Sequence, residues 1–151
     1  MALGMESGRI SDSQISASSE YEDITAAAHG RLNFQEKGAG WAAVRQDANQ
    51  WLQVDLNNEH TSVMSVATQG RTYQDHYQCV KSYKLQSSND SVNFRYYREQ
   101  GNATDKVFIY IICVNWYVKE GFHILSFLVT RNFWGMFNVL LQYMFSAFQL
   151  K

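Results

Sequence analysis

Four histidines are the residues of this chain best suited to acid–base chemistry or to metal binding: His29, His60, His76 and His123. None stands in a His-Glu-x-x-His or Cys-x-x-Cys motif, and the chain has no Gly-x-Ser-x-Gly elbow and no phosphate-binding loop. Asp75 precedes His76, but neighbouring residues of a strand face opposite sides and would not form an acid–base pair. We expect the two to be surface loop residues. The sequence therefore predicts no enzyme and no cofactor.

Three carboxylates fall within four residues, at Glu20, Glu22 and Asp23. Such oxygen ligands could hold calcium, which makes these residues a weak metal candidate. The EF-hand pattern is absent, and a solvated acidic loop accounts for the cluster more simply. We therefore expect no metal site.

Two Asn-x-Ser/Thr sequons begin at Asn89 and Asn102, both in predicted turns. A glycan could be accommodated at either turn if the chain is secreted. The two cysteines, Cys79 and Cys113, are too few for a disulfide framework and have the wrong spacing for a zinc site. The N-terminal residues have no apolar segment of the length that a secretory signal requires, so the chain shows no signal peptide.

Charge divides the chain into two unlike parts. The formal net charge of -1 gives no general attraction for nucleic acid, which we exclude as a partner. Residues 1–106 have a net charge of -3 and residues 107–151 a net charge of +2, and 12 of the 22 aromatic residues lie in the last 45. Two different kinds of sequence therefore meet near Val107.

Short apolar runs separated by Gly, Asn, Asp and Ser clusters dominate the first part, as in antiparallel β structure. In residues 51–56, Leu52, Val54 and Leu56 alternate with polar residues and are expected to face a core. Further strands are predicted in the runs 63–68, 83–86 and 93–98. Strands at such short spacing, without an amphipathic helix between them, indicate a β-sandwich or barrel.

The second part is apolar and aromatic. Its last run, residues 133–150, has 18 residues without a charge, the lower limit for a helix that spans a bilayer. Asn138, Gln142 and Gln149 interrupt this run, and flanking charges are sparse. A helix is one conformation open to this tail, and membrane anchoring is one role open to it.

The motifs of the first part resemble the discoidin domain, also called the coagulation factor V/VIII type C domain. They follow the order that is typical of this family over residues 2–108. The matching segments are Leu3–Ile10, Gln14–Ser19, Gly30–Asn33, Trp41, Asn49–Leu56, Val66–Arg71, Val80–Gln86, Tyr97–Arg98 and Asp105–Phe108.

The resemblance implies an all-β jelly-roll sandwich, secreted or on the cell surface, with loops at one end that grip a ligand. Members of the family bind anionic phospholipid, collagen, other proteins or glycans. The family's three ligand loops align with residues 20–29, 35–40 and 71–78. Matching positions at Arg31, Trp41 and Trp51 are expected to support these loops and the core.

This chain departs from the family pattern in four places. The pair of cysteines that closes the domain is absent, and the pattern stops after Phe108, so that the last strands are missing. Cys79 replaces an aromatic residue, and Ser87 and Ser91 replace a Tyr and a Gly of one turn. We therefore expect an incomplete discoidin domain at residues 1–108 and a hydrophobic tail foreign to the family at residues 109–151. Exposed strand edges would make independent folding doubtful.

By this alignment the ligand-binding candidates are Tyr21, Ile24, His29, Arg71, Tyr73, His76 and Tyr77. The acidic first loop disfavours anionic phospholipid, because each basic residue near such a surface gains about 1 kcal/mol and an acidic residue is repelled. We expect a non-catalytic extracellular adhesion module that recognises a cell-surface or matrix glycan or protein, with anionic phospholipid less favoured. Two alternatives stay open: a membrane-associated protein anchored by the aromatic tail, and a truncated product without a stable fold.

Overall fold

The described part of the chain is built from short strands and single 3-10 turns. The computed structural model describes residues 2–34, 36, 40–57, 63, 66–73, 76–80, 82–109 and 138–144, with the backbone alone for 72, 73, 76, 77, 109 and 138–144. The strands are β1 (Ile15–Ala17), β2 (Gln50–Val54), β3 (Arg71–Tyr73), β4 (His76–Gln78), β5 (Ser82–Ser88), β6 (Arg95–Tyr96), β7 (Val107–Ile109) and β8 (Asn138–Met144). The 3-10 turns are η1 (Asp12–Gln14), η2 (Asp23–Thr25) and η3 (Ala27–His29).

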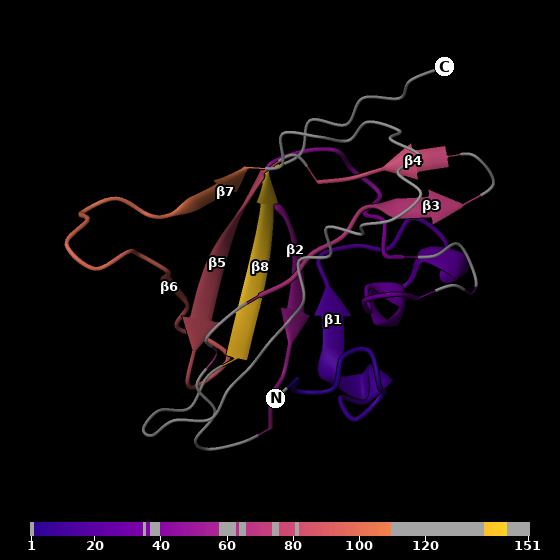
Figure 1. Cartoon of the computed structure of the whole chain (residues 1–151), viewed down its shortest axis with the longest axis horizontal. Coiled ribbons are helices and arrows are strands. Elements are labelled where there is room, and N and C mark those ends of the chain that lie inside the picture. The colour runs from indigo at the N-terminus through magenta and orange to yellow at the C-terminus, as the bar shows by residue number, and fades with distance from the viewer. Residues whose placement is uncertain are drawn as a thin grey trace, which may run out of the picture.

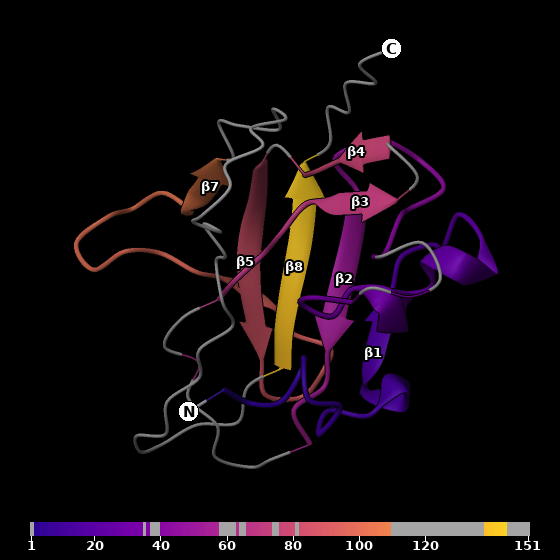
Figure 2. The same cartoon turned by 45° about the vertical axis from the view of Figure 1, so that its right-hand side comes forward.

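Within the described residues the strands form two antiparallel sheets. The larger sheet has the order β1-β2-β8-β5-β6, with β7 also paired to β5, and β3 pairs with β4 in a separate hairpin. Figures 1 and 2 show β3, β4 and the 3-10 turns on one side of the molecule, whereas the segment between β6 and β7 projects from the other. The predicted all-β sandwich of the discoidin type is confirmed.

The core explains why the central strands form where they do. Leu52, Val54 and Leu56 are 3, 1 and 7 % exposed, as their alternation predicts, and Tyr83 of β5 is 2 % exposed. Full burial of a large apolar side chain contributes about 1.5–3 kcal/mol. The ring of Tyr83 stacks on that of Phe108, with the centroids 5.1 Å apart, so β7 is held by side-chain packing as well as by its ladder with β5.

For residues 138–144, strand β8 corrects the expectation that the tail could be helical. Residues 138–144 are extended and lie between β2 and β5, with Leu141 opposite Leu52 on one side and Leu85 on the other. The inner edges of β2 and β5, which would be unpaired without a further strand, therefore have a partner from the tail. An apolar run without a charge can satisfy a buried central strand as well as a helix, which is why its composition alone did not decide.

No helix within the described residues is long and apolar enough to cross a membrane. Two strand predictions also need correction. Residues 66–70 form no strand, because the apolar residues Val66 and Ala67 pack against the core without joining a ladder. The predicted strand at residues 93–98 shortens to β6, since the turn after β5 occupies its first residues.

Candidate ligand-binding loops

The first loop, residues 20–29, is held by hydrogen bonds that its own residues make. Thr25 is 1 % exposed, and its hydroxyl oxygen accepts from the backbone N–H of Glu22 (3.1 Å) and donates to the carbonyl oxygen of Glu22 (3.0 Å). The Thr25 backbone N–H donates to that same carbonyl at 2.8 Å. The Glu20 carboxylate accepts the backbone N–H of Ala27 at 2.7 Å and thereby satisfies a donor at the start of η3. These contacts give the loop one defined shape.

Three apolar side chains are exposed on this scaffold. Tyr21 is 60 % exposed, Ile24 38 % and Val44 55 %. The backbone N–H of Tyr21 donates to the carbonyl of Ala42 at 2.8 Å, and the backbone N–H of Val44 donates to the hydroxyl of Ser19 at 3.2 Å. The loops that carry the three side chains are therefore directly joined. We call Tyr21, Ile24 and Val44 the exposed apolar set.

A buried glutamine ties these loops to the sheet. Gln50, the first residue of β2, is 6 % exposed, and its side-chain oxygen accepts from the hydroxyls of Ser18 and Ser19, both at 2.8 Å. Its side-chain nitrogen donates to Asp47 at 2.9 Å, which, with the backbone N–H of Asn49, lowers the pKa of the Asp47 carboxyl. The loop ends are thus fixed by a polar network that the pattern of residues does not predict.

Of the three positions expected to support the loops and the core, Arg31, Trp41 and Trp51, the first two make side-chain hydrogen bonds beside the first two loops. The indole N–H of Trp41 donates to the carbonyl of Ser19 at 2.9 Å. The guanidinium of Arg31 donates to the carbonyl of Met5 at 2.8 Å and forms an ion pair with Asp12. These bonds connect residues that border the first two loops to Ser19 and to the N-terminal segment.

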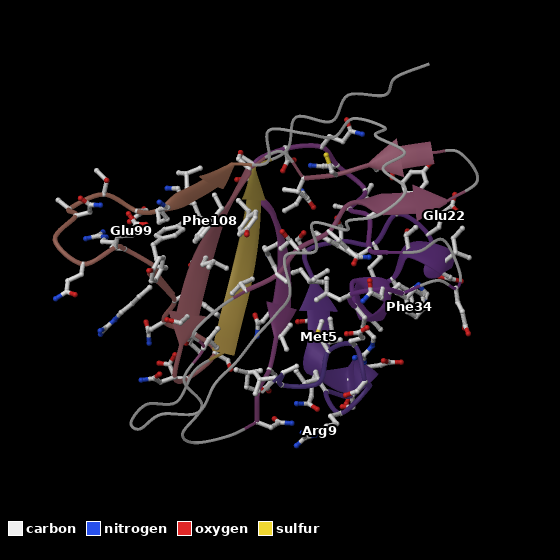
Figure 3. The ribbon with its side chains drawn as sticks, viewed as in Figure 1. Met5, Arg9, Glu22, Phe34, Glu99 and Phe108 are labelled. Atoms are coloured by element: carbon white, nitrogen blue, oxygen red, sulfur yellow. The ribbon has the colours of Figure 1, made fainter. Side chains whose placement is uncertain are left out.

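His29 acts as a connector within the loops. Its Nδ1 lies 3.0 Å from the carbonyl oxygen of Ile24, so the ring N–H donates there, and its ring stacks on Phe34 with the centroids 4.7 Å apart. Figure 3 shows Phe34 and Glu22 on the same side of the molecule. An imidazole held in this way positions the loop. Its Nδ1 and one face of its ring are already in contact with Ile24 and Phe34, so fewer groups remain for a ligand than on a free histidine.

The third loop corresponds to the β3–β4 hairpin, in which Arg71 pairs with Gln78. The Arg71 guanidinium donates to the side-chain oxygen of Gln78 at 2.8 Å. Gly40, at the end of the second loop, has a φ of +149°, and a Cβ placed on it would lie 3.3 Å from the Cβ of Arg71. The second and third loops therefore approach each other closely at a position where a side chain would not fit without strain.

Several sequence-predicted candidates lie outside what the structure describes. Tyr73 and His76 are opposite each other in the hairpin, and Tyr77 follows in β4, but their side chains are outside the description. So are His60 and His123, and the second loop apart from Glu36 and Gly40. Side-chain contacts or exposure are described for four of the predicted candidates: Tyr21, Ile24, His29 and Arg71.

The three acidic residues of the calcium candidate, Glu20, Glu22 and Asp23, lie within the described part of the chain. Among the residues whose positions are described, no group of three or more His, Cys, Asp and Glu side chains lies close enough to hold a metal ion. Glu20 uses one carboxylate oxygen to accept the N–H of Ala27. The acidic residues of this loop are therefore better explained by local hydrogen bonding and solvation than by a shared ligand.

A β-sandwich with three joined loops at one side defines the class of the molecule, and its family follows from comparison with known proteins. A family model, the F5/8 type C domain, matches residues 14–112. The chain belongs to this family, the discoidin domains.

Individual relatives agree with this assignment. Over 112 residues the chain is 42 % identical to lactadherin of Rattus norvegicus and 40 % identical to EGF-like repeat and discoidin I-like domain-containing protein 3 of Homo sapiens. Over 110 residues it is 38 % identical to coagulation factor V of Mus musculus. Each match covers 70 % of this chain, but 26 %, 23 % and 5 % of the three relatives, so the chain corresponds to a small part of each.

Proposed function

We propose that this chain is a non-catalytic, extracellular ligand-binding module, and that its joined loops recognise a glycan or a protein on a cell surface or in the matrix. The family assignment supports the broad statement, since its relatives include extracellular binding proteins. The single observation that carries the assignment to the loops is the exposed apolar set, held outward by hydrogen-bonded backbone.

Aromatic and aliphatic side chains on a rigid frame suit recognition because little conformational entropy is lost when they are buried. Tyrosine is enriched among the residues that dominate binding energy, and it can hydrogen-bond while its ring packs on a flat partner. Removal of one such anchor commonly costs 2 kcal/mol or more, roughly a thirtyfold loss of affinity. Tyr21, the most exposed member of the set, is the residue on which we place most weight.

Charge favours glycan or protein over anionic phospholipid. Glu20, Glu22 and Asp23 flank Tyr21 and Ile24, and all three acidic residues are exposed. A negatively charged membrane would repel them, whereas a sugar or a basic protein surface would not. Arg71 adds hydrogen-bond donors at the neighbouring loop that suit a hydroxyl or a carboxylate.

Screening the purified chain against glycan arrays, collagen and cell-surface ectodomains tests this proposal. We expect Tyr21→Ser and Val44→Ser to weaken binding of the ligand so found at least tenfold, without a change in thermal unfolding. Val92→Ser is the matched control for Val44→Ser, because Val92 is an exposed valine (77 %) of the segment between β5 and β6.

Two results would overturn the proposal. Equal loss of affinity for Val92→Ser and Val44→Ser would show that the loops are not the ligand-binding site. Stronger binding to vesicles that contain phosphatidylserine than to any glycan or protein, retained at physiological salt, would replace the ligand class with an anionic lipid surface.

A further inference from the structure

We propose that Asn102 is an N-glycosylation site at the tip of the projecting segment between β6 and β7. The residues of its sequon, Asn102-Ala103-Thr104, are all exposed. This proposal rests on the extracellular location proposed above, because the modifying enzyme acts in the secretory pathway. It concerns a region that the ligand-binding loops do not use.

The projecting segment closes on itself before it reaches the sequon. The backbone N–H of Lys106 donates to the carbonyl of Tyr97 at 3.0 Å. Arg98 and Asp105 form an ion pair at 3.0 Å, and Lys106 and Glu99 form another at 2.7 Å. These contacts join the two ends of the segment at its base, and its tip, residues 100–104, is exposed to solvent.

The tip itself is a tight turn that ends on the acceptor residue. The backbone N–H of Asn102 donates to the carbonyl of Glu99 at 3.0 Å, and Gly101 has a φ of +87°, the value that a type II turn requires at its third residue. The Asn102 amide nitrogen has one long contact, 3.4 Å, with the Glu99 carboxylate. A contact of that length on an exposed side chain is readily given up.

Figure 3 places Glu99, in the same turn as Asn102, on the opposite side of the molecule from Glu22 and Phe34. A bulky oligosaccharide attached at this turn would extend away from the exposed apolar set. The glycan would therefore leave the proposed ligand site open and shield the sheet edge at β6 and β7.

The reaction is a transfer from a lipid-linked oligosaccharide pyrophosphate. The Asn102 amide nitrogen bonds to the anomeric carbon of the first sugar as the bond between that carbon and the pyrophosphate oxygen breaks. The amide loses one proton, and the lipid pyrophosphate leaves. The hydroxyl of Thr104 is required by the transferase that recognises the sequon, which also excludes proline at position 103.

The second sequon, Asn89-Asp90-Ser91, is an internal comparison with a different environment. The Asp90 carboxylate accepts the backbone N–H groups of Val92 (3.0 Å) and Asn93 (2.7 Å), and these bonds lower the pKa of the Asp90 carboxyl. Ser91 has a φ of +59°. This turn is thus fixed around the middle residue of its sequon, and we expect Asn102 to be modified more completely than Asn89.

The test uses the full chain behind a cleavable leader, translated with microsomes and expressed in secreting animal cells. Peptide N-glycosidase F should lower the mass of the wild-type protein and leave aspartate at position 102, which peptide mass spectrometry reads directly. Thr104→Ser keeps the sequon and should keep the glycan. Thr104→Ala and Asn102→Gln destroy it and should each remove one oligosaccharide.

The substituted residues lie on an exposed turn, and the number of attached oligosaccharides can be read from the mass even where a variant is poorly folded. Absence of aspartate at position 102 after digestion, in wild-type protein protected inside microsomes, would overturn the proposal. Attachment of as many oligosaccharides to Thr104→Ala as to Thr104→Ser would do the same. Ligand binding is measured on the enzymatically deglycosylated chain, so failure of the glycan and failure of the proposed function are separate results.

Discussion

Thr25→Val should loosen the first loop, although the shape and volume of the substituted side chain hardly change. Valine keeps the β-branched form of threonine, but it removes the hydroxyl that bonds both the N–H and the carbonyl of Glu22. A typical intramolecular hydrogen bond contributes about 0.5–1.5 kcal/mol, so the two lost bonds cost roughly 1–3 kcal/mol. The free energy of unfolding, measured with urea, should fall by that amount.

Hydrogen exchange gives a sharper readout of the same change. The Glu22 amide donates to the Thr25 hydroxyl, so in Thr25→Val this amide should exchange much faster than in wild type. Thr25→Ser keeps the hydroxyl and removes one methyl group, at a cost of about 1 kcal/mol, and it should keep the Glu22 amide protected. If that amide exchanges alike in the serine and valine variants, the hydroxyl does not hold the loop, and the reasoning is refuted.

Three further perturbations test other parts of the structure. Leu141→Pro removes a backbone N–H from the central strand β8, so amide protection should fall in both β2 and β5; unchanged protection in β5 would contradict the pairing. Gly40→Ala should cost about 1–3 kcal/mol through its positive φ and its contact with the third loop, and more than Gly8→Ala, where φ is also positive but no atom is near. Hydrogen bonds from Arg98 and Lys84 hold the pKa of the Asp105 carboxyl below its ordinary value of 3.8. The stability that this carboxylate contributes is therefore complete above pH 3.8 and is lost as the pH falls through its lower pKa in the folded protein. Urea unfolding of Asp105→Asn should be less sensitive to this acidification than that of wild type.

The core and the sheet were predictable where the pattern is local. Leu52, Val54 and Leu56 alternate with the period of a strand, so their side chains share the face that packs on the core. The strand around Tyr83 was predicted for the same reason. The position of β8 was not predictable, because its partners are far away in the sequence and a run without charges specifies burial without specifying conformation.

The loops were predictable in location and not in structure. Tyr21 and Ile24 could be named from the family alignment, whereas Val44 joins them only through a hydrogen bond from its backbone to Ser19. Gln50 likewise appears as an ordinary polar residue at the start of a strand. Its burial and its two serine donors depend on contacts between segments more than 30 residues apart, for which a single sequence carries no signal.

The order of the strands has a consequence for how the protein is made. β8 separates β2 from β5, although it is the last of the described strands to be synthesised. The larger sheet therefore cannot be completed until residue 144 has left the ribosome, and until then β2 and β5 have open inner edges. Contacts between such distant segments slow folding and prolong the exposure of unpaired strands. Chaperone binding during synthesis should thus matter more for this chain than for a domain whose central strand is made early.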